Sequence, residues 1–333
     1  MTRLLAFGLK LCISWAFQES TVANHSARTA LLALLVVTII WGWTFPWMKE
    51  AIDTAKGELG DALPFIVGLF MTIRFGIASL LMPLIIRGAR IDMTKGSVWR
   101  DGAILAFFLL AGFLLQMFGL DGVDPAVSAF LTSLYVAFTA LISSILSRTF
   151  PGIVAVIGVA LVTVGAAFIS GPPQLNFDVS EWLTVFCAVL FAGHIVATDR
   201  VTRRSNPLTV AWTSFVWVTL GSVVLLAIGW TMEPSISPPK VLSLLAMEGF
   251  IRPVLLAGVF GSLVALSLLT NFQKFLSPVR AAILYSLEPV WAALIALFLG
   301  QVTMNGWLLF GGSLLLIGNL WMEIWPRLRK QSS

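Results

Sequence analysis

The sequence is poor in charge, cysteine and histidine. Charged residues make up 11% of its 333 residues and hydrophobic residues 58%, whereas an ordinary soluble domain carries about 25% charge. So few charges cannot cover a water-facing surface, which excludes an ordinary soluble enzyme and a disordered chain. The two cysteines, Cys12 and Cys187, exclude a secreted disulfide scaffold. The two histidines, His25 and His194, argue against a histidine-built metal site.

Long hydrophobic runs are what the sequence has in abundance. A helix needs about 20 apolar residues to cross a bilayer, and ten such runs are bounded by charges, proline or glycine. Their lengths, without alternation of period two, favour helices over a membrane barrel. We therefore predict an all-α integral membrane protein with ten transmembrane helices, at 29–48, 63–86, 102–120, 125–146, 150–170, 179–198, 207–229, 253–273, 278–299 and 304–325.

Positive charges are unevenly distributed over the loops between these runs. With the N-terminus in the cytoplasm, 16 of the 21 lysines and arginines fall on the inner side and four on the outer side, and Arg74 is left inside a span. This positive-inside bias predicts an even number of spans and two cytoplasmic termini. The positive residues behind the net charge of +5 thus orient the chain in the membrane and meet anionic lipid. No clustered basic face points to nucleic acid.

Two terminal segments lie outside the spans. Residues 1–28 are predicted to be a cytoplasmic segment, in which the apolar stretch 4–17 is either a surface amphipathic helix or an over-long start of the chain. A cleaved signal peptide fits less well, because no small-residue cleavage site separates this stretch from the first span. Residues 326–333 are predicted to be a cytoplasmic tail.

An internal repeat relates the two halves of the chain. Residues 125–168 align with 278–321 at a constant offset of 153, with 12 of 44 positions identical. A weaker match at an offset of 151 pairs Gly42 with Gly193. We predict two copies of one five-span unit, at 29–170 and 179–325. An odd number of spans per copy inverts one copy relative to the other, as is typical of secondary transporters. The alternative is a duplicated membrane protein without a transport role.

Four glycines of the repeat indicate where helices pack. Gly158 and Gly165 are seven residues apart, as are their equivalents Gly311 and Gly318. Residues seven apart lie on one helix face, and small residues let membrane helices approach closely. We therefore expect spans 5 and 10 to be packing elements rather than cavity walls.

Five segments carry a family pattern: IIWGWTFPWMKEAI, RFGIASLLM, SAFLTSLYVAFTAL, LYSLEPVWAAL and GGSLLLIGNL, in spans 1, 2, 4, 9 and 10. Together they resemble the EamA-type transporters of the drug/metabolite transporter superfamily, over about residues 30–325. The resemblance implies a ten-helix inner-membrane carrier for small metabolites such as amino acids or drugs. It also implies export by alternating access, through a cavity between the halves to which spans 4 and 9 contribute.

Two ionisable residues inside spans are the first candidates for a site, because such residues usually face a cavity or a partner. Glu288 is followed by Pro289, which is expected to kink span 9. Glu288 either binds a cationic substrate group, carries a coupling proton, or only hydrogen-bonds the broken helix. Arg74 either attracts an anionic substrate group, pairs with Glu288, or bonds backbone carbonyls.

Polar and aromatic residues complete the candidate cavity. Tyr135 occupies the repeat position of Glu288, and His194 that of Trp43. Trp43 belongs either to a cavity wall or to an interfacial belt, and His194 is either a proton relay or a packed residue. Pro46 is expected to kink span 1. The remaining candidates are hydroxyl and amide side chains in or near the same spans: Thr132, Ser133, Tyr285, Ser286 and Gln116.

The function predicted from these features is secondary transport of a small organic solute, with proton coupling through Glu288 as a hypothesis. No P-loop, nucleophile elbow, zinc-protease motif or acid cluster is present, so we expect no cofactor, no metal and no enzymatic activity. The alternatives are a nucleotide-sugar or lipid-linked carrier on the same fold, or a membrane-embedded enzyme. The expected partners are the solute and the lipid bilayer, and the sequence leaves a homodimer open.

Overall fold

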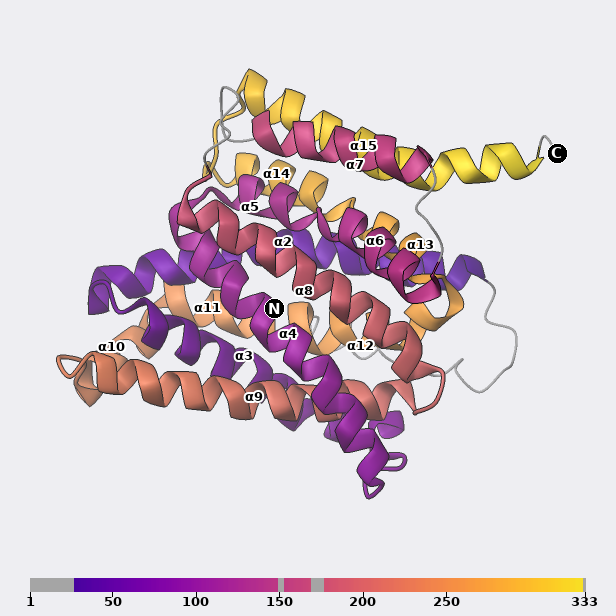
Figure 1. The fold of residues 1–333 in the computed structure, drawn as a ribbon. Helices are drawn as coiled ribbons and strands as arrows, with labels where there is room; N and C mark the ends of the chain where they lie inside the picture. Colours follow the sequence, from indigo (N-terminus) through magenta and orange to yellow (C-terminus); the bar gives the residue numbers. More distant parts are fainter. Residues whose placement is uncertain (1–26, 149–152, 169–176, 332–333) are drawn as a thin grey trace.

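The computed structural model describes residues 27–148, 153–168 and 177–331, which are helical with no strand (Figure 1). Within these ranges, seven helical segments are long and apolar enough to cross a membrane. Two shorter apolar helices, Glu288–Phe298 and Gly306–Gly318, accompany them. The chain is a multi-pass membrane protein. The predicted segment 1–28 lies outside the described residues except for its last two.

The first half of the chain begins with three long helices. They are α2 (Ala27–Leu59), α3 (Leu63–Ile85) and α4 (Gly96–Gly122). Shorter elements follow or connect them: η2 (Arg87–Arg90), α5 (Pro125–Thr132), α6 (Tyr135–Ser147) and α7 (Ile153–Phe168). Proline in the first turn begins α3 and α5, where its missing N–H costs no helical hydrogen bond.

The second half repeats the order of the longer helices and adds short elements between them. Its elements are α8 (Val179–Thr202), α9 (Pro207–Met232), α10 (Pro238–Ala246), α11 (Glu248–Leu256), η3 (Ala257–Val264), α12 (Ala265–Phe272), η4 (Gln273–Phe275), α13 (Pro278–Tyr285), α14 (Glu288–Phe298) and α15 (Gly306–Gln331). The segment η3 is a π-helical stretch that joins α11 and α12 into one span. A capping box between Asp178 and Glu181 begins α8, and the Asn206 side chain caps α9.

Several helices extend past the predicted span limits. The helix α2 continues to Leu59 rather than ending near residue 48, and it is not interrupted at Pro46. The helix α15 continues to Gln331, so it includes most of the segment 326–333 that was predicted as a tail. The helix α10 lies in what the sequence indicates as a loop. Hydropathy marks only the apolar part of a helix, whereas polar ends continue into the membrane interface.

Two helical segments at equivalent positions of the repeat, 125–147 and 278–298, are each broken in two. The first break falls at Ser133–Leu134, between α5 and α6, and the second at Ser286–Leu287, between α13 and α14. The two breaks are 153 residues apart, the offset of the repeat. Pro289 lies directly after the second break, as its expected kink requires, whereas no proline accompanies the first.

Equivalent helices of the two halves pack antiparallel. A Cβ built on Gly165 would lie 2.7 Å from the Gly311 oxygen, and one on Gly318 would lie 2.9 Å from the Gly158 oxygen, so α7 and α15 touch backbone to backbone (Figure 1). The order of these contacts along each chain segment is reversed, which makes the helices antiparallel. Between α3 and α9, contacts of Gly68 with Leu226 and of Gly229 with Phe65 run in the same antiparallel sense.

Candidate solute-binding site

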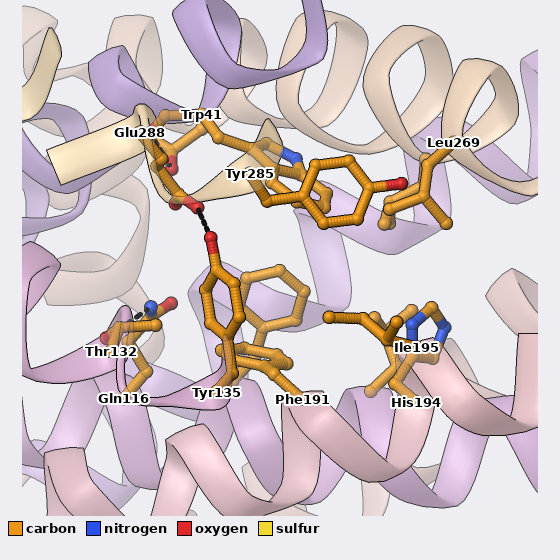
Figure 2. Close-up of a pocket in the computed structure, with 14 residues that line it drawn as sticks. Trp41, Gln116, Thr132, Tyr135, Phe191, His194, Ile195, Leu269, Tyr285 and Glu288 are labelled. Atoms are coloured by element: carbon orange, nitrogen blue, oxygen red, sulfur yellow. Dashed lines mark hydrogen bonds between the residues drawn. The ribbon is translucent and has the colours of Figure 1, made fainter. Parts of the chain in front are cut away.

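A cavity with an empty volume of about 490 Å³ lies among the helices of both halves (Figure 2). The wall consists of 14 residues from α2, α4, α5, α6, α8, α12, α13 and α14: Trp41, Thr44, Leu109, Phe113, Gln116, Thr132, Tyr135, Phe191, His194, Ile195, Leu266, Leu269, Tyr285 and Glu288. No described side chain of α7 or α15 lines the cavity, as their glycine spacing predicts.

The cavity follows the repeat in position but not in chemistry. Ten of the lining residues form five pairs separated by 151 or 153 positions: Thr44 with Ile195, Phe113 with Leu266, Gln116 with Leu269, Thr132 with Tyr285, and Tyr135 with Glu288. No pair is identical. A nearly symmetric backbone therefore presents an asymmetric set of side chains to whatever enters.

The two broken spans bring Tyr135 and Glu288 together. Tyr135 is the first residue of α6 and Glu288 the first residue of α14, so each begins the second half of its span. The Tyr135 hydroxyl donates a hydrogen bond of 3.3 Å to Glu288 Oε2, and both side chains are buried (Figure 2). The N-terminus of a helix carries partial positive charge that favours a carboxylate. The break between α13 and α14 thus places the carboxyl group of Glu288 where the backbone can stabilise its charge.

Aromatic rings on the wall are held by hydrogen bonds at their polar ends. The Trp41 indole N–H donates to the Gly261 carbonyl at 3.2 Å, and the Tyr285 hydroxyl donates to Gln273 Oε1 at 3.2 Å. Gln273 is itself fixed by a 2.7 Å bond to the Ile195 carbonyl. The rings of Trp41 and Tyr285 lie 5.6 Å apart and are tilted by 57°. Both tyrosines of the chain line this cavity.

A model of the EamA-like transporter family matches the chain twice, at residues 28–171 and 179–323. The chain belongs to the EamA-like transporter family. It is 29% identical over 308 residues to a curated protein of Archaeoglobus fulgidus described as an uncharacterized transporter, covering 92% of this chain and 90% of that protein. A solved structure titled "Crystal structure of protein" shares the fold, with a TM-score of 0.63 at 18% identity over 92% of this chain and 100% of that one.

In this EamA transporter, six of the predicted site residues lie on the cavity wall: Glu288, Tyr135, Thr132, Tyr285, His194 and Gln116. The Gln116 amide donates to the Thr132 hydroxyl at 3.4 Å, and that hydroxyl lies 3.7 Å from Cys187 Sγ. These three groups form a short polar chain that runs from two wall residues to Cys187 and links α4, α5 and α8.

Arg74 lies beside the cavity but not in it. Its side chain is fully buried, its Nε donates to Ser262 Oγ at 2.8 Å, and its guanidinium carbon lies 4.2 Å from the ring centre of Phe113. The predicted ion pair with Glu288 does not form. Arg74 packs against Phe113, which lines the cavity, so the arginine supports a wall residue.

Three further predicted residues also lie outside the wall. Trp43 stacks on Trp47, with ring centres 5.8 Å apart, so that it faces away from the cavity that Trp41 lines. The Ser133 hydroxyl donates to the Phe130 carbonyl at 2.6 Å, within its own helix. Ser286 is buried but is not part of the lining. Serines at helix breaks bond the local backbone readily, which explains their distance from the wall.

The apolar lining residues were missed by reasoning from polarity. Leu109, Phe113 and Gln116 recur at spacings of four and three in α4, and Trp41 and Thr44 are three apart in α2. Residues at these spacings share one helix face. Gln116 therefore marks the face on which Phe113 and Leu109 lie, a signal that the sequence does contain. Among the described residues, no three His, Cys, Asp or Glu side chains gather as a metal site would require.

Proposed function

We propose that this transporter is a secondary carrier that exports a small organic solute by alternating access, coupled to protons at Glu288. The cavity carries this proposal, because equivalent helices of both halves line it and a single carboxyl group lies on its wall. Inverted repeats can exchange their conformations, which moves the opening of a shared cavity from one side of the membrane to the other.

The proposed topology has ten spans, arranged as two inverted repeats at 29–170 and 179–325, with both termini in the cytoplasm of a bacterial-type inner membrane. Support comes from the bias of positive charge in the loops. The antiparallel packing of α3 with α9 and of α7 with α15 is what inversion of the second repeat requires.

Ion pairs between the halves are the proposed closures at the two ends of the cavity. Asp101, at the start of α4, is buried and accepts hydrogen bonds from Arg204 and Ser205, beyond α8. The hydrogen bond to Asp101 raises the pKa of Arg204. Arg252 of α11 pairs with Glu50 of α2 at 2.6 Å. Alternating access would separate one of these pairs while the other remains closed.

Glu288 is suited to carry a proton because its charge has no counter-ion. In the part of the chain that the structure describes, no lysine, arginine or histidine lies within ion-pair distance of its carboxylate. A buried, uncompensated charge is costly, and either a proton or a cation removes that cost. Opening the cavity to each side in turn would expose this carboxyl group to two different proton concentrations.

Flux measurements on purified full-length protein in liposomes test this proposal. Labelled amino acids, amines and drug-like solutes are offered with and without an imposed pH gradient. We expect the gradient to drive solute movement by the native protein and by Glu233→Gln, an acid at the end of α9 that lies outside the cavity. We expect Glu288→Gln to lose the response to the gradient. Flux that ignores the gradient, or a solute recovered chemically altered, would contradict the proposal.

A further inference from the structure

The charged side chains on the cavity wall are of one sign only among the described residues. Glu288 is the single acid among the lining residues, and no lysine or arginine lines the wall. Arg74, the buried cation nearest in the fold, is occupied by Ser262 and by the ring of Phe113, which lines the cavity. His194 lies at the opposite end of the cavity from Glu288 (Figure 2). An anionic solute would therefore meet one carboxylate and no strong cation.

Aromatic residues are the largest group among the other wall residues. Five of the 14 lining residues are aromatic apart from histidine: Trp41, Phe113, Tyr135, Phe191 and Tyr285. Figure 2 shows Trp41, Tyr285 and Glu288 on one side of the space, with Tyr135 and Phe191 facing them. Faces of aromatic rings attract cations by their quadrupole, tryptophan most strongly, and more so where water is excluded.

Two rings on the same side of the cavity as Glu288 are pre-organised. The bond from Trp41 to Gly261 and the bond from Tyr285 to Gln273 fix both polar ends away from a solute. The faces and edges of these rings are then left to make contact. A rigid aromatic site loses little conformational entropy on binding, which favours affinity.

We infer that the transported solute is an organic monocation with an apolar body, whose positive group lies at Glu288 between the rings of Trp41 and Tyr285. This inference rests on the proposed function and adds the chemical class of the solute. A neutral solute of the same shape leaves the carboxylate without a counter-ion, and an anion adds a second negative charge beside it. The cavity thus selects by charge first and by shape second.

Probes that share one aromatic body and end in a cationic, neutral or anionic group test the inference. Calorimetric titration of the purified protein uses two sets: phenylethylammonium with 3-phenylpropanamide and 3-phenylpropionate, and tryptammonium with the corresponding indole amide and carboxylate. We expect each cation to bind at least about tenfold more tightly than its amide, and each anion to bind most weakly. Equal affinities within both sets, or no binding by either cation, would overturn the inference.

Variants locate the cation within the cavity. We expect Glu288→Gln to bring cation and amide to similar affinities, and Trp41→Leu to weaken cation binding by about threefold to tenfold. Trp47→Leu is the matched control, because Trp47 stacks on Trp43 and not on the wall. Monodisperse elution and helical circular dichroism verify that each variant folds. A folded Trp41→Leu protein with unchanged cation affinity would also count against the inference.

The two proposals fail separately. If pH-driven flux occurs with neutral or anionic solutes and without preference for cations, the inference falls and secondary transport stands. If cations bind with the expected preference but no solute crosses the liposome membrane, the proposed function falls and the cation site stands.

Discussion

At the scale of single residues, Arg74 shows how a buried charge can serve packing. Its guanidinium lies over the ring of Phe113 and bonds Ser262, while Nη2 has no hydrogen-bond partner among the described residues. No acid pairs with it there. A planar, weakly hydrated guanidinium tolerates such a site far better than a compact ammonium group does.

Replacement of Arg74 by lysine should therefore destabilise the protein more than replacement by methionine. Arg74→Lys keeps the charge but loses the stacking on Phe113 and buries a more strongly hydrated group, at a cost of about 1–3 kcal/mol. Arg74→Met fills the space without a charge. The midpoint of thermal unfolding in detergent should decrease in the order native, Arg74→Met, Arg74→Lys. A methionine variant less stable than the lysine variant would show that the positive charge itself is required.

At the scale of helices, some breaks in regular structure could be predicted from the sequence and others could not. Pro289 predicts the break between α13 and α14, whereas the break between α5 and α6 has no proline and follows only from its repeat equivalent. The π-helical segment Ala257–Val264 carries Gly261 and Ser262, which accept bonds from Trp41 and Arg74. A change of helical hydrogen-bond register leaves no pattern in composition, so this segment could not be predicted.

The contact between α7 and α15 should depend on its glycines. A Cβ at Gly165 would lie 2.7 Å from backbone atoms of α15, which cannot move aside as a side-chain end can. We expect Gly165→Ala to cost about 1–3 kcal/mol of stability and to lower the thermal midpoint. Gly306→Ala, at the start of α15, is the control, because nothing lies within 4 Å of its Cβ. Equal midpoints for the two variants would refute close packing at Gly165.

At the scale of the whole molecule, the repeat accounts for most of what could be predicted. Hydropathy and the offset of 153 indicate the helical class, the duplicated order and the equivalence of Tyr135 with Glu288. The cavity was predictable only where polar residues interrupt apolar spans, as Gln116 does. Trp41 and Phe191 could not be distinguished from other apolar residues, because their exposure depends on how helices from both halves meet.

Accessibility of the cavity from each side of the membrane tests the central claim most directly. In a background of Cys12→Ser and Cys187→Ser, a single cysteine is placed by Thr44→Cys or by Ile195→Cys, the equivalent wall positions of the two halves. A membrane-impermeant maleimide is then applied to one side of oriented liposomes. A separate single-cysteine protein, Lys240→Cys, reports the orientation, because Lys240 is exposed in α10. Alternating access predicts that each wall position is labelled from both sides. Labelling from one side only, whatever the direction of the pH gradient, would contradict it.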